Sequence, residues 1–171
     1  MKRSFVPFFG KCGSRSALAA IEQEEVTVLD YSHNNLVSVP EEVIIYELSL
    51  EELYLDSNRL TELPRWLFQC FGLRTLGLSD NEFQHLSSSI ANLINLERLD
   101  ISKNGIQELP DKLRFCKRLV FLEASMNPIG RLPEGLMMLI NLKELYLNDT
   151  FLEYLPGSFG KYIKSSNIII I

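Results

Sequence analysis

The most reactive side chains in this sequence are three cysteines and two histidines, namely Cys12, Cys70, Cys116, His33 and His85. Thiolates and imidazoles hold zinc only at short, defined spacings, and they act as nucleophile and base only beside a partner group. No zinc-type spacing occurs, and no nucleophile or carboxylate pair is assembled around either histidine. We therefore predict that the protein is not an enzyme and that it holds no metal, cofactor or small-molecule substrate.

The composition limits the class of protein further. A chain of 171 residues with 46% apolar content has enough surface to bury for one domain or one array of small units. Its formal charge of -5 argues against nucleic acid, which needs a concentrated positive face. An odd number of cysteines without paired spacing favours a reducing compartment. No apolar run approaches the roughly 18 residues that span a bilayer.

One polar residue recurs at a fixed interval of 23 or 24 residues. Asparagine takes five of these positions and threonine the sixth: Asn34, Asn58, Asn81, Asn104, Asn127 and Thr150. The surrounding residues repeat with them, as in LEELYLDSNRLTELP from Leu50 and LERLDISKNGIQELP from Leu96. Each unit is expected to begin with a short strand and then turn at the asparagine, whose amide can satisfy backbone groups that no strand reaches.

This is the leucine-rich repeat pattern, and its period lies within the range of that fold. The predicted fold class is α/β, a curved solenoid of about six repeats of 23 residues with parallel strands on the concave face. We expect a leader at 1–25 with a short capping helix, a repeat domain at 26–164, and a truncated seventh repeat or non-native tail at 165–171.

The position of a residue within the repeat predicts its role in the fold. Cys70 and Cys116 take a place that leucine holds in other units, so they are expected to fill the core as small hydrophobes. They lie two strands apart, on the order of 9–10 Å, which is too far for a disulfide. Five of the seven prolines fall six residues after the asparagine position, where proline fixes the return of the chain. Ser87 replaces proline in the third unit and predicts slight local loosening there.

The outward strand residues should form columns across the concave face, where a solenoid of this kind offers an extended binding surface. Carboxylates outnumber basic groups in these columns, and aromatic residues lie among them. Such a mixture is typical of an interface core with a charged rim, and it favours a protein partner with a basic patch. The ordinary alternative is a solvated sheet face without a partner. The candidate partner-binding residues are Tyr54, Asp56, Arg98, Asp100, Phe121, Glu123, Met126 and Tyr146.

The residues of the individual repeats indicate a family more specifically than the repeat period does. Between Val26 and Gly160 the chain resembles the opening repeats of the LAP family of scaffold proteins, on the segments VLDYSHNNLVSVPEEV, LEELYLDSNRLTELP, ISKNGIQELP, EASMNPIGRLPEG and LYLNDTFLEYLPGSFG. The resemblance implies a non-enzymatic cytoplasmic scaffold, peripheral at the inner face of the basolateral, junctional or postsynaptic membrane. It also implies a role in cell polarity, receptor localisation and signalling. The alternative is a soluble repeat adaptor that regulates a Ras/Rho-type GTPase or a phosphatase; an extracellular receptor domain is disfavoured.

The segment near the start of the chain, SFVPFFGKCGS from Ser4, raises the question of a membrane anchor. Their apolar stretch is too short for a secretion signal and is broken by basic residues. The first 20 residues contain four basic groups and no acid, so they suit an anionic leaflet, and an acyl chain on Cys12 would supply the second signal that stable anchoring requires. Lipidated leader cysteines are also what the LAP resemblance implies, although this chain has Cys12 alone. A disordered tail is the alternative.

After Gly160 the sequence departs from the repeat pattern and reads KYIKSSNIIII. Ser165 stands where the next unit's first leucine belongs, while Ile168 and Ile170 still match the inward positions of a seventh strand. A stack that ended there would leave an apolar strand edge uncapped. We therefore expect a fragment, a truncated splice form or a gene-model artefact that lacks later repeats and a PDZ domain.

Overall fold

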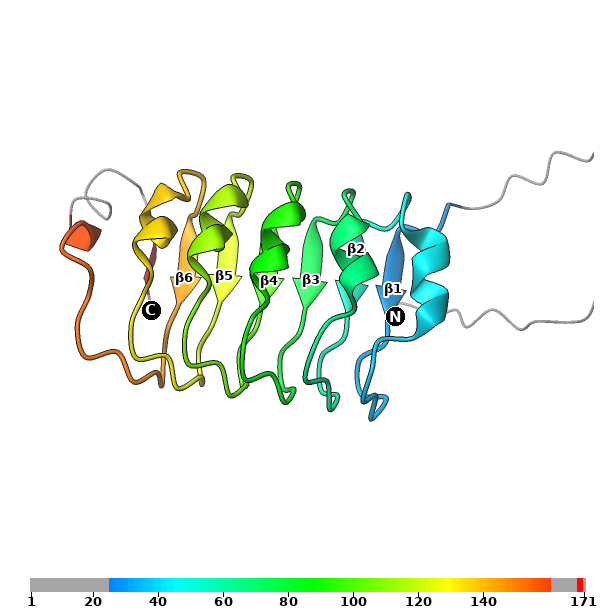
Figure 1. Ribbon diagram of the computed structural model, residues 1–171, viewed down its shortest axis with the longest axis horizontal. Coiled ribbons are helices and arrows are strands. Elements are labelled where there is room, and N and C mark those ends of the chain that lie inside the picture. Colours follow the sequence, from blue (N-terminus) through cyan, green and yellow to red (C-terminus); the bar gives the residue numbers. More distant parts are fainter. Residues whose placement is uncertain (1–24, 161–168, 171) are drawn as a thin grey trace, which may run out of the picture.

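The computed structural model describes residues 25–160 and 169–170, and the leader with Cys12 and its predicted capping helix lies outside them. The described strands form one parallel sheet in chain order, as Figure 1 shows. They are β1 (Val28–Asp30), β2 (Glu52–Tyr54), β3 (Thr75–Gly77), β4 (Arg98–Asp100), β5 (Phe121–Glu123), β6 (Glu144–Tyr146) and β7 (Ile169–Ile170). This arrangement confirms the predicted leucine-rich repeat solenoid.

Each strand from β1 to β5 is followed by a turn and a short helix that brings the chain back to the next strand. The named helices are all of the 3-10 type: η1 (Glu41–Tyr46), η2 (Arg65–Gln69), η3 (Ser88–Asn92), η4 (Asp111–Phe115) and η5 (Glu134–Met138). A 23-residue period leaves room for only one or two tight turns between the asparagine and the next strand, so the return is short.

Proline and serine start these helices. Pro64, Pro110 and Pro133 precede η2, η4 and η5 with φ between -66 and -70°, which is the angle that the proline ring imposes. Ser87 takes the same place before η3, and its hydroxyl accepts a hydrogen bond from the Ser89 N–H at 3.2 Å. The serine side chain thus caps the helix that proline would otherwise start, and the loosening expected at Ser87 stays a prediction.

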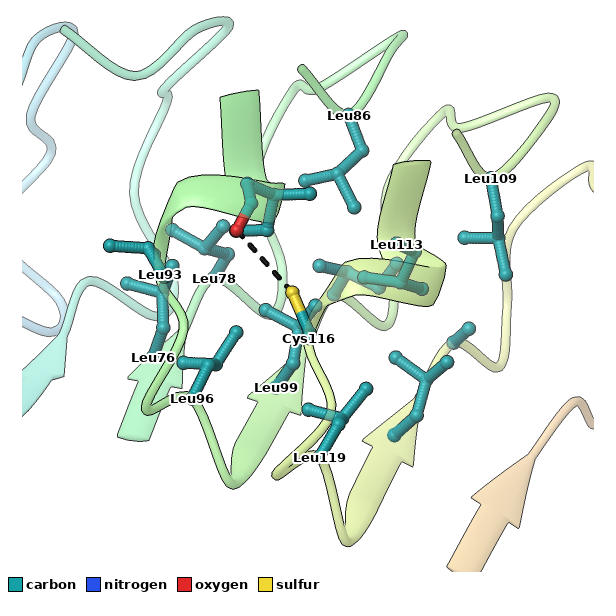
Figure 2. Packing of buried hydrophobic residues seen from close by; sticks show 14 of the residues in the cluster. Leu76, Leu78, Leu86, Leu93, Leu96, Leu99, Leu109, Leu113, Cys116 and Leu119 are labelled. Atoms are coloured by element: carbon teal, nitrogen blue, oxygen red, sulfur yellow. Dashed lines mark hydrogen bonds between the residues drawn. The ribbon is translucent and has the colours of Figure 1, made fainter. Parts of the chain in front are cut away.

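The core lies between the sheet and the helices and consists of leucines stacked from one repeat to the next. The middle residues of the strands share one register, so Leu76, Leu99 and Leu122 contact in sequence and are fully buried. Figure 2 shows this packing around Leu99 and Cys116. Because each unit buries its leucines only against its neighbours, the stability of the fold depends on the stack rather than on one repeat.

Cys70 and Cys116 are free and fully buried, which confirms their prediction as core residues. The Cys116 thiol lies 3.4 Å from the Ile90 carbonyl oxygen and donates to it, as drawn in Figure 2. Burial raises the pKa of both thiols to about 11, so they stay protonated at neutral pH. They are therefore poor nucleophiles and metal ligands where they stand.

The end of the described chain extends the sheet. Ile169 and Ile170 of β7 pair in parallel with Glu144 and Leu145 of β6. Ile170 thus takes the register position that Leu145 holds in the preceding repeat. Within the described part of the chain, no helix has the length and hydrophobicity to cross a bilayer.

Candidate functional site

The outward side chains of the strands form two columns in strict register, and we call them together the open sheet face. The first column consists of Val28, Glu52, Thr75, Arg98, Phe121 and Glu144. The second column consists of Asp30, Tyr54, Gly77, Asp100, Glu123 and Tyr146. Because parallel strands lie roughly 4.8 Å apart, neighbours within a column are close enough for their side chains to touch.

Three of the predicted residues form a contact cluster at the centre of this face. The Arg98 guanidinium lies over the Phe121 ring at 4.0 Å from its centroid, and the Phe121 and Tyr146 centroids are 5.5 Å apart at 45°. Among the described residues, Arg98 has no carboxylate within ion-pair distance, whereas Arg59, Arg74, Arg114 and Arg131 each have at least one. The open sheet face thus presents a cation stacked on an aromatic ring and left without an anion.

Tyr146 of this cluster and Tyr54 lie in identical Glu-Leu-Tyr strands. The Tyr54 hydroxyl donates to Glu52 Oε2 at 2.7 Å, and the Tyr146 hydroxyl donates to Glu144 Oε2 at 3.2 Å. Burial and the Glu52 hydrogen bond raise the pKa of Tyr54 to about 12, and the bond to Glu144 likewise raises the pKa of Tyr146. Both phenols are therefore neutral donors at physiological pH, and the strand beneath fixes their orientation.

A hollow of about 440 Å³ opens in the sheet face above Gly77. Its lining includes the predicted residues Tyr54, Asp56, Arg98, Asp100 and Phe121. A Cβ atom at Gly77 would overlap the Asp56 carboxylate, so glycine is what lets this side chain lie across the floor.

The Asp56 carboxylate in this hollow is poorly solvated. Its Oδ1 accepts from the Ser79 N–H at 2.8 Å, but burial raises the pKa of the Asp56 carboxyl, and the charges of Asp100 and Asp30 act in the same direction. Glu123 adds a further carboxylate in the same column and accepts from the Ser125 N–H at 2.9 Å. A cation placed over the hollow would relieve this repulsion.

Asp56 and Met126 are the two predicted contact residues that do not lie on a strand, and Met126 is the farther from its strand. It follows β5 in the turn, with φ of 57°, and half of its surface is exposed. The residue before each asparagine position adopts the same left-handed conformation: His33, Ser57, Asp80, Lys103, Met126 and Asp149. From the sequence, Met126 was expected among the outward strand residues, because it is not the glycine that usually marks this backbone conformation.

The asparagine positions serve the fold rather than a partner. Asn58, Asn81, Asn104 and Asn127 each accept a backbone N–H of the preceding repeat at 3.0 Å. Their amide nitrogens donate to carbonyl oxygens of the preceding repeat and of their own turn. At the two ends the network is thinner, since Asn34 donates to Ser32 and Thr150 donates to Leu147 alone.

No group of three or more His, Cys, Asp or Glu side chains within 25–160 and 169–170 is arranged to hold a metal ion. The carboxylates of the open sheet face are distributed along the stack and do not converge on one point. What this face offers is a row of aromatic and charged side chains, which suits recognition of another macromolecule.

Comparison with known proteins shows which family and which relatives the repeats match. The sequence profile of the family described as Leucine rich repeat matches residues 24–83 and 71–129. Leucine-rich repeat-containing protein 7 of Rattus norvegicus and of Homo sapiens is 54% identical over 74 residues, 43% of this chain. Erbin of Homo sapiens is 56% identical over 55 residues, 32% of this chain. These matches support the LAP resemblance, over shorter stretches than the repeats themselves suggest.

The chain spans only a small part of these relatives. The matched region is 5% of the length of leucine-rich repeat-containing protein 7 and 4% of the length of Erbin. The similarity therefore concerns the repeats and not the remainder of either protein.

Proposed function

Because the chain belongs to the leucine-rich repeat family, we propose that it is a non-enzymatic scaffold or adaptor that binds a partner protein through the open sheet face. Solenoids of this kind use their extended sheet surfaces to hold partners. The proposal concerns binding alone, since the buried thiols and the dispersed carboxylates offer no assembled chemistry.

The observation that carries the proposal is the cluster of Arg98, Phe121 and Tyr146. An aromatic pair in contact with an arginine is the composition of a binding hot spot, and here it lies among carboxylates that suit a surrounding polar rim. An ordinary solvated sheet face does not need an unpaired arginine stacked on phenylalanine. The acidic surroundings favour a partner segment with basic residues, which would meet Asp56 and Asp100 in the hollow above Gly77.

Affinity capture with the chain as bait tests this surface. We expect the double substitution Phe121→Ala/Tyr146→Ala to reduce recovery of specific partners by about 30-fold, since hot-spot truncation costs about 2 kcal/mol. The matched control is Arg59→Ala/Arg131→Ala, which removes two exposed ion pairs away from the open sheet face. Equal recovery by all three baits, with unchanged thermal midpoints, would rule out this face as the binding surface.

The proposal also includes the cellular location of the protein. Similarity to Erbin and to leucine-rich repeat-containing protein 7 supports a LAP-type role at the cytosolic face of a basolateral, junctional or postsynaptic membrane, in polarity and receptor localisation. The basic, aromatic leader supports peripheral attachment, with Cys12 as the lipidated residue.

Cys12→Ala tests the attachment in fractionated cells that express the full chain. We expect the membrane-bound share of the protein to fall several-fold, because one acyl chain and a basic segment are both needed for stable anchoring. Ser14→Ala is the control, since it changes the same leader without removing a thiol. An unchanged membrane share would instead favour a soluble repeat adaptor of GTPase or phosphatase signalling.

A further inference from the structure

A row of exposed apolar side chains runs along one edge of the solenoid, at the loops that connect each helix to the next strand. The row takes one residue from each of five successive rungs: Leu48, Phe71, Ile94, Lys117 and Ile140. The four apolar members are 90%, 54%, 57% and 75% exposed. In Figure 1 these loops form the upper edge, where the strands begin. We call this row the apolar rim. Large apolar side chains gathered on a surface mark a contact site.

The charges beside the apolar rim are ordered along it. At the end near β2 the neighbouring charges include Glu47 and Glu51, and Arg74 is shared between Glu51 at 3.8 Å and Glu97 at 3.4 Å. At the other end lie Lys117, Arg118 and Lys143, and segments 112–122 and 135–143 contain no acidic residue. One half of the rim is therefore acidic and the other half is basic.

We propose that the apolar rim is a homodimer interface that pairs with the rim of a second copy in antiparallel orientation. A two-fold axis at Ile94 reverses the row, so Leu48 faces Ile140 of the second copy and Ile94 faces its equivalent. Lys117, which interrupts the apolar row, then faces Phe71 of the second copy and can place its side chain over the ring. The same axis places Glu51 opposite Lys143 on both sides of the dimer. It places Glu97 opposite its own equivalent, where the ion pair of each Glu97 with Arg74 at 3.4 Å offsets the repulsion.

The repeat spacing also favours a second copy. Both rims carry one residue per rung at the same strand spacing of roughly 4.8 Å, so all five pairs can form without a shift in register. An anionic membrane would attract the half with Lys117 but repel Glu47, Glu51 and Glu97. The chain's own first 20 residues carry basic groups only and would complement just one half. The self-complementary order of charges is what separates a second copy from these occupants.

Sedimentation velocity of the full chain over a range of concentrations tests the interface. We expect the wild-type mass to rise from 19.6 kDa towards twice that value as the chain is concentrated, and Ile94→Ser/Ile140→Ser to remain monomeric. Val37→Ser is the control, since Val37 is 68% exposed elsewhere on the surface and its loss should leave the dimer unchanged. A wild-type chain that stays monomeric at every concentration overturns the proposal.

Charge exchange tests the antiparallel pairing itself. Glu51→Lys alone and Lys143→Glu alone each place like charges opposite one another twice, so both should dimerise at least tenfold more weakly than the wild type. Mixing these two variants restores both opposite-charge pairs, and we expect a dimer that contains one copy of each. If the two variants formed no mixed dimer, the predicted orientation would be wrong.

Vesicle binding distinguishes a membrane from a second copy as the partner of the apolar rim. Vesicles of equal parts phosphatidylserine and phosphatidylcholine should bind the wild type and Ile94→Ser/Ile140→Ser alike, because the leader is the same in both. Loss of vesicle binding in the double variant, with no wild-type dimer, would assign the rim to lipid and overturn the proposal. This interface does not depend on the open sheet face, so Phe121→Ala/Tyr146→Ala should dimerise as the wild type does.

Discussion

Replacing Asn127 by alanine is expected to lower the free energy of unfolding by about 3–5 kcal/mol. The side chain is almost fully buried and makes four hydrogen bonds to backbone groups. Its removal leaves the Ile106 N–H and the Ala124 carbonyl without partners inside the stack. Each unsatisfied buried group costs about 1–3 kcal/mol. Urea denaturation followed by circular dichroism measures the change.

Asn34→Ala is the matched control for this prediction. Asn34 holds the same place in the first repeat, but its side chain is exposed and donates only to the Ser32 carbonyl at 2.9 Å. We expect a loss of about 0.5–1 kcal/mol, the value of one ordinary hydrogen bond. Asn127→Thr, which copies the residue at position 150, should fall between the two, because Thr150 keeps one bond to its own turn. Equal losses at Asn34 and Asn127 would show that the links between repeats contribute nothing.

The repeat architecture could be predicted from the sequence because its signal is periodic. A fixed interval between Asn58, Asn81 and Asn104 sets the strand register, and alternating leucines then decide which side faces the core. A residue that differs from the repeat consensus is predicted in the same way, since Cys116 is buried in a place that leucine holds in other units. Periodicity therefore predicts the strand register and the buried positions of each repeat.

What the period could not predict lies in features that depend on contacts between particular side chains. The 23-residue period places Arg98 and Phe121 side by side in one column, but it does not indicate that the guanidinium stacks on the ring. The cap supplied by Ser87 was also missed, since proline and serine satisfy the same turn by different means. Met126 was placed on a strand because a left-handed turn without glycine has no reliable sequence marker.

The two proposed surfaces differ in chemistry and in position. The open sheet face is rich in carboxylates and aromatic rings, whereas the apolar rim carries single apolar residues with separated charges. In a dimer formed through the rim, both open sheet faces would stay accessible, so two partner proteins could be held together. Such an arrangement would increase the apparent affinity for a partner that is itself clustered.

Leu99→Ala is expected to destabilise the chain by about 3–4 kcal/mol, within the range for leucine truncation in a well-packed core. Leu99 is fully buried at the centre of the stack, in register with Leu76 on one side and Leu122 on the other. A cavity there weakens the contacts on both sides at once, and it separates the repeats into two groups that are each less stable. We therefore expect a lower urea midpoint and also a shallower transition, because the two groups no longer unfold together.

Leu29→Ala is the control, since Leu29 holds the same register position in β1 but is only partly buried and has a described neighbour strand on one side. Its loss should cost about 1–2 kcal/mol, because less apolar surface is removed from the core and the cavity can open to water. The slope of the transition should stay as in the wild type, since the stack remains continuous from β2 onwards. If Leu99→Ala lowered the midpoint without changing the slope, the repeats would unfold as one unit despite the central cavity. Coupling between neighbouring rungs would then be stronger than the packing of single leucines implies.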